Sequence, residues 1–402
     1  MGVVKNTKTV AWILMQLLLK SMTKEEKYKA YKELFYNNFI YNNNSDIQGS
    51  NIPLSEVDFD SMNGKIGDGT INLATYIQYI FTCVKLGEST EKELNKVLST
   101  LRRLIDGCYQ MFVAKCPNVY FKKEPGFFLR DDVSSNLASK FGLKNIRSGY
   151  SRGIERIDED PCFSPFVSQD QIWNLVPILS YLSKTYEKAK ELGKDITEYV
   201  VKNKHIIYNP YYSALYHNWT YLRIFEPYWE RIEERNRKLK YTIKVKRGAN
   251  NWYFSYGFKK TYNKFGGDSK TFWSSLWYKP FIFLADRLYH PYICKWFKLP
   301  VKNTSYYSLA VAGNAWYGGD YESRIVKKFN KSLETSLRDG SELFMPQLAF
   351  LTSKRMDINL NLLGEYIEKY PIPSRSGWVN SPLDFMLLYN QYKLLKNDAS
   401  SL

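Results

Sequence analysis

Two aspartates stand where a carboxylate could take part in acid–base chemistry. Asp170 comes directly before an apolar, helix-forming stretch, and Asp132 follows Arg130 in the stretch FFLRDDVSSN. Cleavage of a glycosidic bond commonly uses two carboxyl groups, one to protonate the leaving oxygen and one to activate water or attack the anomeric carbon. We therefore predict Asp170 as the general acid and Asp132 as the base or stabilising carboxylate.

The helix that must hold Asp170 is well marked. Ser168 is typical of an N-cap, Gln171 of its capping-box partner, and the pattern predicts a helix over residues 169–184. One apolar face is expected, made of Ile172, Leu175, Val176 and Leu179. Free N–H groups and the helix dipole favour an ionised carboxylate in the first turn, so a general acid there needs burial, for example against Trp173, to raise its pKa. The alternative is that Asp170 only complements the helix terminus.

Further polar and aromatic side chains could orient a sugar. Arginine binds carboxylates and hydroxyls through paired N–H groups, and aromatic rings stack on sugar rings. The predicted substrate-binding residues are Arg130, Tyr150, Arg152, Gln171, Trp173 and Trp378. Internal salt bridges and core packing explain the same residues without a ligand. Asp131 and Asp132 could likewise cap a helix and pair with Arg130.

The chain is basic and rich in aromatic residues. Its net charge is +17, from 57 Lys and Arg against 40 Asp and Glu, and 33 of its 402 residues are Tyr. Such a chain suits an anionic partner, either an acidic polysaccharide or a nucleic acid. The basic residues are spread along the chain and form no single-sign tail, which favours a solvated surface over nucleic-acid binding.

Several kinds of chemistry are disfavoured. The five cysteines are odd in number and lack CxxC spacing, and the three histidines show no metal-ligand spacing. Phosphate-binding GxxxxGK and GxGxxG motifs do not occur. We therefore expect no metal and no cofactor.

The first residues, MGVVKNTKTVAWILMQLLLKSM, contain a short apolar run between lysines. The run is interrupted by Gln16, lacks a small-residue cleavage site and is too short to span a membrane. We predict a helix from Val10 to Ser21, no membrane span and a cytoplasmic protein, with secretion as the alternative.

Helical patterns dominate the rest of the chain. They predict helices over about 24–39, 73–86, 91–115, 186–202, 305–317 and 321–338, and a last helix after Asn380-Ser381-Pro382. Alternating residues around Gly248–Asn251 predict one β-hairpin over 238–260. With no linker, residues 1–402 are expected to form one mainly α domain, an (α/α) toroid of helical hairpins whose loops build the site at one end.

The stretch SQDQIWNLVPILSYL resembles an inner-helix motif of six-hairpin (α/α) glycosidases, especially the unsaturated rhamnogalacturonyl and glucuronyl hydrolases. Asp170, Trp173, Pro177 and Leu179 match the order of that motif, and RSGWVNSPLDFMLLYNQYKLLK looks like a second inner-helix start. The resemblance implies that Asp170 protonates the glycosidic oxygen of an oligo- or polysaccharide. Polysaccharide lyases share this architecture, and in that case Tyr150 would be a candidate base.

Two other classes of protein stay open. One is a non-catalytic helical protein, such as a virion component or scaffold, in which the acidic loop is an interface. The other is a basic nucleic-acid-binding protein, whose affinity would fall steeply with salt. The sequence does not indicate the oligomeric state.

Overall fold

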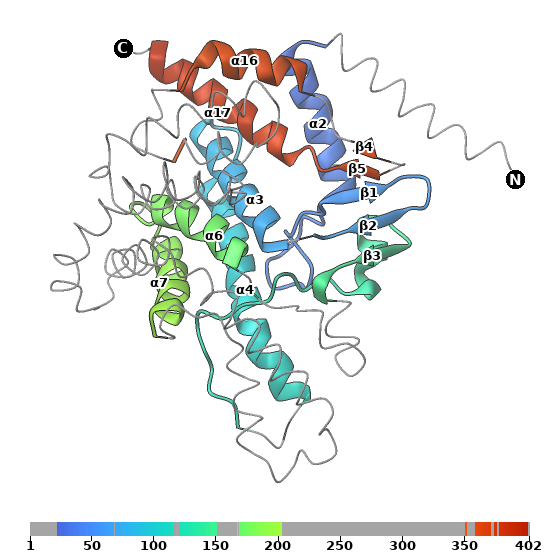
Figure 1. Ribbon diagram of the computed structural model, residues 1–402, viewed down its shortest axis with the longest axis vertical. Helices are drawn as coiled ribbons and strands as arrows, with labels where there is room; N and C mark the ends of the chain where they lie inside the picture. Colours follow the sequence, from blue (N-terminus) through green and yellow to red (C-terminus); the bar gives the residue numbers. More distant parts are fainter. Residues whose placement is uncertain are drawn as a thin grey trace, which may run out of the picture.

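The described part of the protein is mainly helical, as predicted, with a small sheet beside the helices (Figure 1). In this computed structural model the described residues are 22–67, 69–115, 117, 120–150, 167, 169–202, 350–351, 358–370, 374–375 and 378–400. The predicted elements at 10–21, 238–260, 305–317 and 321–338 lie outside these residues.

Helix α2 (Lys24–Asn38) begins at the predicted capping box. The Thr23 side chain accepts the N–H group of Glu26, and the Glu26 carboxylate accepts the N–H group of Thr23 at 2.9 Å. Tyr31 and Phe35 are fully buried on its inner face. Local capping and burial of one face therefore define this helix.

The next two helices form an antiparallel hairpin. Helix α3 (Gly69–Lys85) ends before Gly87, which adopts a φ of 72°, and α4 (Glu91–Lys115) begins after Thr90, whose hydroxyl accepts the N–H group of Glu93. A left-handed glycine after a helix is a common stop signal. The hairpin predicted from 73 to 115 is thus confirmed, with α3 starting four residues earlier.

A second hairpin contains the helix of Asp170. Helix α6 (Gln169–Leu182) starts at the predicted residue, and α7 (Glu187–Lys202) follows after a short turn. The predicted apolar face is confirmed, because Ile172, Leu175, Val176 and Leu179 are all buried. Pro177 lies inside α6.

The C-terminal part supplies α16 (Leu360–Lys369), which was not predicted, and the predicted last helix, α17 (Leu383–Ser400). The Ser381 hydroxyl accepts the N–H group of Leu383, and Asp384 lies in the first turn. Helix α17 packs against α2, α3 and α16 (Figure 1).

Helix α3 contacts both α17 and α6, and the three helices start close together in the described part of the chain. Phe81 and Tyr181 contact edge to face at 5.5 Å, and each lies equally far beyond the first residue of its helix. The starts of both helices also lie beside the segment of residues 128–131, because Gly69 approaches Arg130 and the N–H group of Val167 binds the carbonyl of Phe128. With two matched positions, helices α3 and α6 run in the same direction. The backbone of Ser55 binds the N–H group of Ser381, and its hydroxyl binds that of Gly67, so α17 and α3 begin close together. We call this end, with the first residues of α3, α6 and α17, the common end.

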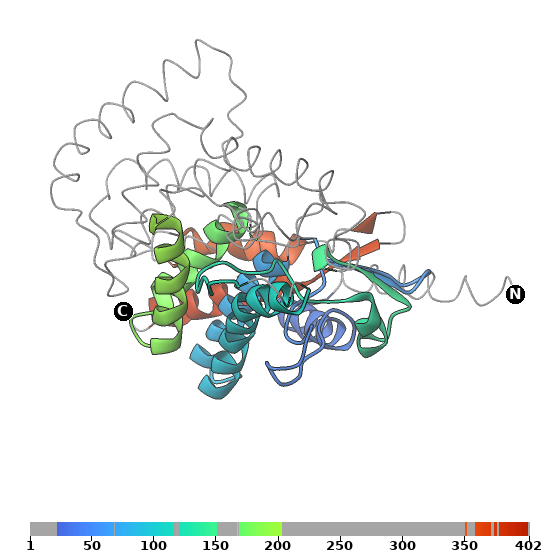
Figure 2. The same ribbon diagram turned by 90° about the horizontal axis from the view of Figure 1, so that it is seen from below.

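A five-stranded sheet lies beside the common end (Figure 2). The strands are β1 (Glu56–Asp58), β2 (Asn63–Lys65), β3 (Asn145–Arg147), β4 (Ser374–Arg375) and β5 (Trp378–Asn380), in the order β3-β2-β1-β5-β4. All pairs are antiparallel except β2 with β3. The 3-10 helix η1 (Ser135–Phe141) precedes β3. The sequence did not predict this sheet.

One hydrophobic core connects the described helices with the sheet; its members include Phe39, Val57, Tyr76, Leu104, Leu175 and Phe385. In the described part of the chain, we find no helix with the length and apolar character that crossing a membrane requires.

Candidate functional site

The segment of residues 128–134 links two of the helix starts at the common end. The carbonyl of Phe128 accepts the N–H group of Val167, just before α6. Gly69, the first residue of α3, lies so close to the segment that a Cβ there would be 2.7 Å from the carbonyl oxygen of Arg130 and from Cβ of Asp131. A glycine at this position allows the close approach of the two backbones. The RDD stretch is therefore placed between the starts of α3 and α6.

Asp132 forms an ion pair with Arg103 of α4. Its Oδ2 accepts Nε of Arg103 at 2.6 Å, and its Oδ1 accepts Nη2 at 2.9 Å and the N–H group of Gly49 at 3.0 Å. The side chains of Asp132 and Arg103 are 9% and 14% exposed. Two parallel N–H···O bonds make this pair geometrically specific, and both carboxylate oxygens have partners in the protein.

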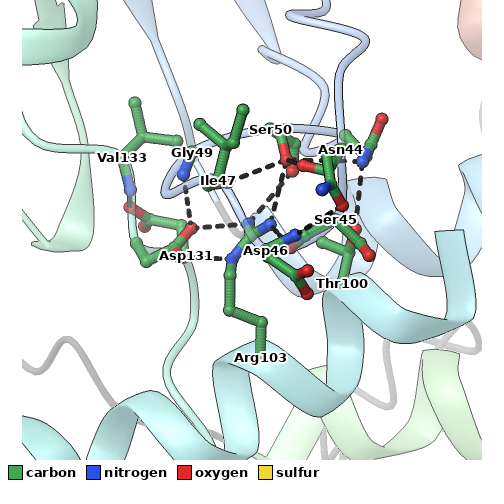
Figure 3. A network of polar contacts seen from close by, with 12 residues as sticks. Asn44, Ser45, Asp46, Ile47, Gly49, Ser50, Thr100, Arg103, Asp131 and Val133 are labelled. Carbon is green, nitrogen blue, oxygen red and sulfur yellow. Dashed lines mark hydrogen bonds and ion pairs between the residues drawn. The ribbon is translucent and has the colours of Figure 1, made fainter. Parts of the chain in front are cut away.

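The guanidinium of Arg103 also holds the Asn-rich loop before β1. It donates to the carbonyl oxygens of Ser45 and Ser50 and to the hydroxyl of Ser50. Figure 3 shows that the side chain of Arg103 extends from α4 and lies between this loop and the segment with Asp131 and Val133. One side chain therefore joins three segments that are distant in sequence.

Asp131 is fully buried beside the start of α3. Its Oδ1 accepts the N–H group of Val133 and its Oδ2 that of Gly149, each at 3.1 Å. Burial raises the pKa of the Asp131 carboxyl to about 7; the charge of Asp132 acts in the same direction, while the N–H groups of Val133, Tyr150 and Gly149 oppose both effects. The two neighbouring carboxyl groups thus have different surroundings, one paired with a cation and one bound by backbone N–H groups.

The structure places Asp170 in the first turn of α6, at the common end. Gln171, the next residue, is fully buried. The side chains of Asp170 and Trp173 and the proposed N-cap Ser168 lie outside the described residues. The predicted start of this helix at Gln169 is confirmed, and the assignment of Asp170 as the general acid with Asp132 as its partner stays a prediction.

Three of the other predicted binding residues belong to the described part of the chain. Arg130 and Tyr150 are half-buried, and Tyr150 packs against the core. Trp378 is half-buried on β5, opposite Asp58 of β1. Arg152 lies outside the described residues. Arg130 and Tyr150 are therefore near the segment of Asp132, and Trp378 belongs to the strand that leads into α17.

Arg103 is the residue at this end that the sequence analysis missed. The stretch LRRL places it on α4 beside Arg102, and no local pattern distinguishes the two. Arg102 instead pairs with Asp195 of α7 at 2.7 Å. Only the fold shows which arginine faces the common end.

Among the described residues, no group of three or more His, Cys, Asp or Glu side chains is arranged to hold a metal ion.

Comparison with known proteins gives no relative for this chain. No family model, no curated protein and no solved structure matches it.

Proposed function

We propose that the protein is a carbohydrate-active enzyme, a glycoside hydrolase that cleaves an oligo- or polysaccharide at the common end, with Asp170 as the general acid. The observation that carries the proposal is that α3, α6 and α17 start close together at the common end. Asp170 therefore lies near the RDD segment, Tyr150 and the strand of Trp378. Loops and helix starts at one end of such an arrangement are where sites are commonly built.

The proposed ring architecture extends the described half of the molecule. Helix α3 contacts α17 on one side and α6 on the other. Helix α2 packs against α17, α4 against α3, and α7 against α6 and α4. In an (α/α) toroid, inner helices run in one direction and outer helices return in the other. The arrangement of α3 with α4 and of α6 with α7 is consistent with two hairpins of such a toroid, formed by the whole chain of 402 residues.

In this proposal Asp132 has the stabilising role. A base must reach a water molecule at the sugar, whereas both oxygens of Asp132 already accept N–H groups from Arg103 and Gly49. Its ion pair instead fixes the segment that lies between the starts of α3 and α6. The basic net charge of +17 favours an acidic polysaccharide over a neutral one.

The test is an assay of the full chain on neutral and acidic polysaccharides, including unsaturated oligosaccharides released by lyases, with reducing ends and loss of the unsaturated chromophore as readouts. Removing a general acid typically costs a factor of about 10²–10⁴ in rate, so Asp170→Asn should lose at least about 100-fold while its circular dichroism and melting stay unchanged.

The matched control is Glu187→Gln, which removes an acid from the first turn of α7, the hairpin partner of α6. Glu187 is exposed and pairs with Lys190, so this variant should keep full activity. Unchanged activity of Asp170→Asn would refute the assignment of the acid.

The second candidate is a non-catalytic helical protein whose common end is an interface. It is favoured by the described acidic side chains of the RDD segment, because Asp131 and Asp132 are both buried and bound by protein groups. Absence of cleavage across the whole panel would support this candidate.

A further inference from the structure

The contacts of Asp131 join its own segment, residues 128–134, to the segment that follows β3. Its Oδ1 binds the N–H group of Val133 on its own segment, and its Oδ2 binds that of Gly149, which follows β3. Gly149 directly precedes Tyr150, a predicted substrate-binding residue. The hydroxyl of Ser148 donates to the carbonyl of Val133 and adds a second bond between these segments.

We propose that Asp131 is a positioning residue of the common end, whose ionised carboxylate holds Gly149, and with it Tyr150, against the segment between the starts of α3 and α6. The role of Asp131 is inferred from hydrogen-bond geometry. The reaction that this role would serve rests on the proposed function.

The geometry makes the hold depend on protonation. An ionised carboxylate has two acceptor oxygens, and here each accepts a different backbone N–H group. Adding a proton turns one oxygen into a donor, so the bond to Val133 or the bond to Gly149 must weaken. The bond from Ser148 to Val133 does not involve Asp131, so it joins the two segments in either protonation state.

The charged surroundings of Asp131 come from three elements. Its own segment carries Arg130 and Asp132, and α4 contributes Arg103, which pairs with Asp132. The segment of Gly149 contributes Arg147 and Tyr150, whereas Gly69 and Thr70 of α3 have no ionisable side chain. Burial raises the pKa of Asp131 to about 7, so the carboxyl changes its charge near neutral pH.

The decisive measurement is the amide resonance of Gly149 in full-length protein labelled with 15N-glycine, followed from pH 5 to pH 9 and assigned with Gly149→Ala. An amide that donates to a titrating carboxylate shifts with it, so the resonance should move with a midpoint near the pKa of Asp131. In Asp131→Asn the shift should vanish. A resonance that stays constant in the wild type, or titrates unchanged in Asp131→Asn, would overturn the proposal.

Asp58→Asn is the matched control, because Asp58 also accepts two backbone N–H groups, those of Asp60 and Ser61, but in a partly exposed turn. This variant should leave the Gly149 titration intact. Loss of the titration in Asp58→Asn as well would mean a general effect of removing a carboxylate, and would count against Asp131.

Activity separates this inference from the proposed function. If an activity lost in Asp170→Asn is found, its kcat/KM in wild type should rise as pH passes through 7, and Asp131→Asn should lack this step. If Asp170→Asn retains the activity, the assignment of the acid fails, while the Gly149 resonance still decides the role of Asp131.

Discussion

The ammonium group of Lys27 donates to the carbonyl oxygen of Glu368 at 2.6 Å, and so joins α2 to the last turn of α16. Lys27 is 3% exposed, and its Nζ also lies 3.5 Å from the carbonyl of Tyr370. The last carbonyl groups of a helix lack intrahelical partners and form the negative end of its dipole. Burial lowers the pKa of Lys27, and the charge of Glu368 opposes this effect.

Lys27→Met should therefore destabilise the protein. Methionine fills a similar volume but leaves the carbonyl groups of Glu368 and Tyr370 without this donor, which costs about 1–3 kcal/mol. Urea unfolding at pH 7 measures the loss. Lys29→Met, on an exposed position of the same helix, is the control and should change the free energy of unfolding by less than about 0.5 kcal/mol. Equal stability of both variants would contradict the assigned role.

Arg103→Ala should be more damaging than Arg102→Ala. Removing one partner of a buried pair leaves the other charge uncompensated, and losses of about 3–5 kcal/mol are typical. The Arg102–Asp195 pair is more exposed, with side chains 32% and 22% accessible, so its loss should cost about 1 kcal/mol or less. Unfolding by urea of the two variants compares them directly, and similar losses would show that the Arg103 network is not a special contact.

Asp131 should make stability depend on pH. Burial raises its pKa to about 7 in the folded protein, well above the ordinary value of an aspartate, so the folded state retains the proton more strongly and stability falls as pH rises from about 4 to 7. The full change is on the order of a few kcal/mol for a buried group. Asp131→Asn does not titrate at this position. The free energy of unfolding of the variant, taken relative to wild type, should therefore be higher at pH 8 than at pH 5.

Melting of both proteins at the two pH values tests this expectation. The variant loses one acceptor at every pH, so the informative quantity is the difference between its effects at pH 8 and at pH 5. A constant effect across this range would mean that Asp131 does not exchange its proton there.

Gly126→Ala should destabilise the contact between the loop after α4 and α7. A Cβ at Gly126 would lie 2.0 Å from the carbonyl oxygen of Asp195 and 2.6 Å from Cβ of Tyr199, so the backbone must move. Overpacking of this kind typically costs about 1–3 kcal/mol. At Gly67 the nearest atom would be 3.6 Å away, so Gly67→Ala is the control with little expected effect in thermal unfolding.

The helices were predictable where their signals are local. The capping box of Thr23 and Glu26, the Thr90 cap and the apolar face of α6 lie within a few residues of the elements that they define. The start of α6 at Gln169, and with it the place of Asp170, followed from these signals.

The sheet could not be predicted in the same way. Its strands are two or three residues long, too short for an alternating pattern, and β1 pairs with β5 from the other end of the chain. The Arg103–Asp132 pair was missed for a related reason, because the two residues belong to elements whose contact depends on the packing of α4. Helix α16 has an N-cap at Asn359 that the sequence analysis did not use.

The pairing of β1 with β5 has a consequence for synthesis of the chain. Val57 pairs with Val379, and α2 and α3 pack against α17, so these residues cannot make their native contacts until the C-terminal part has been synthesised. At a translation rate of about 5–20 residues per second, these surfaces stay uncovered for roughly twenty seconds to a minute. Contacts of such long sequence separation also form slowly. The nascent chain is therefore expected to depend on chaperones until its last helix has left the ribosome.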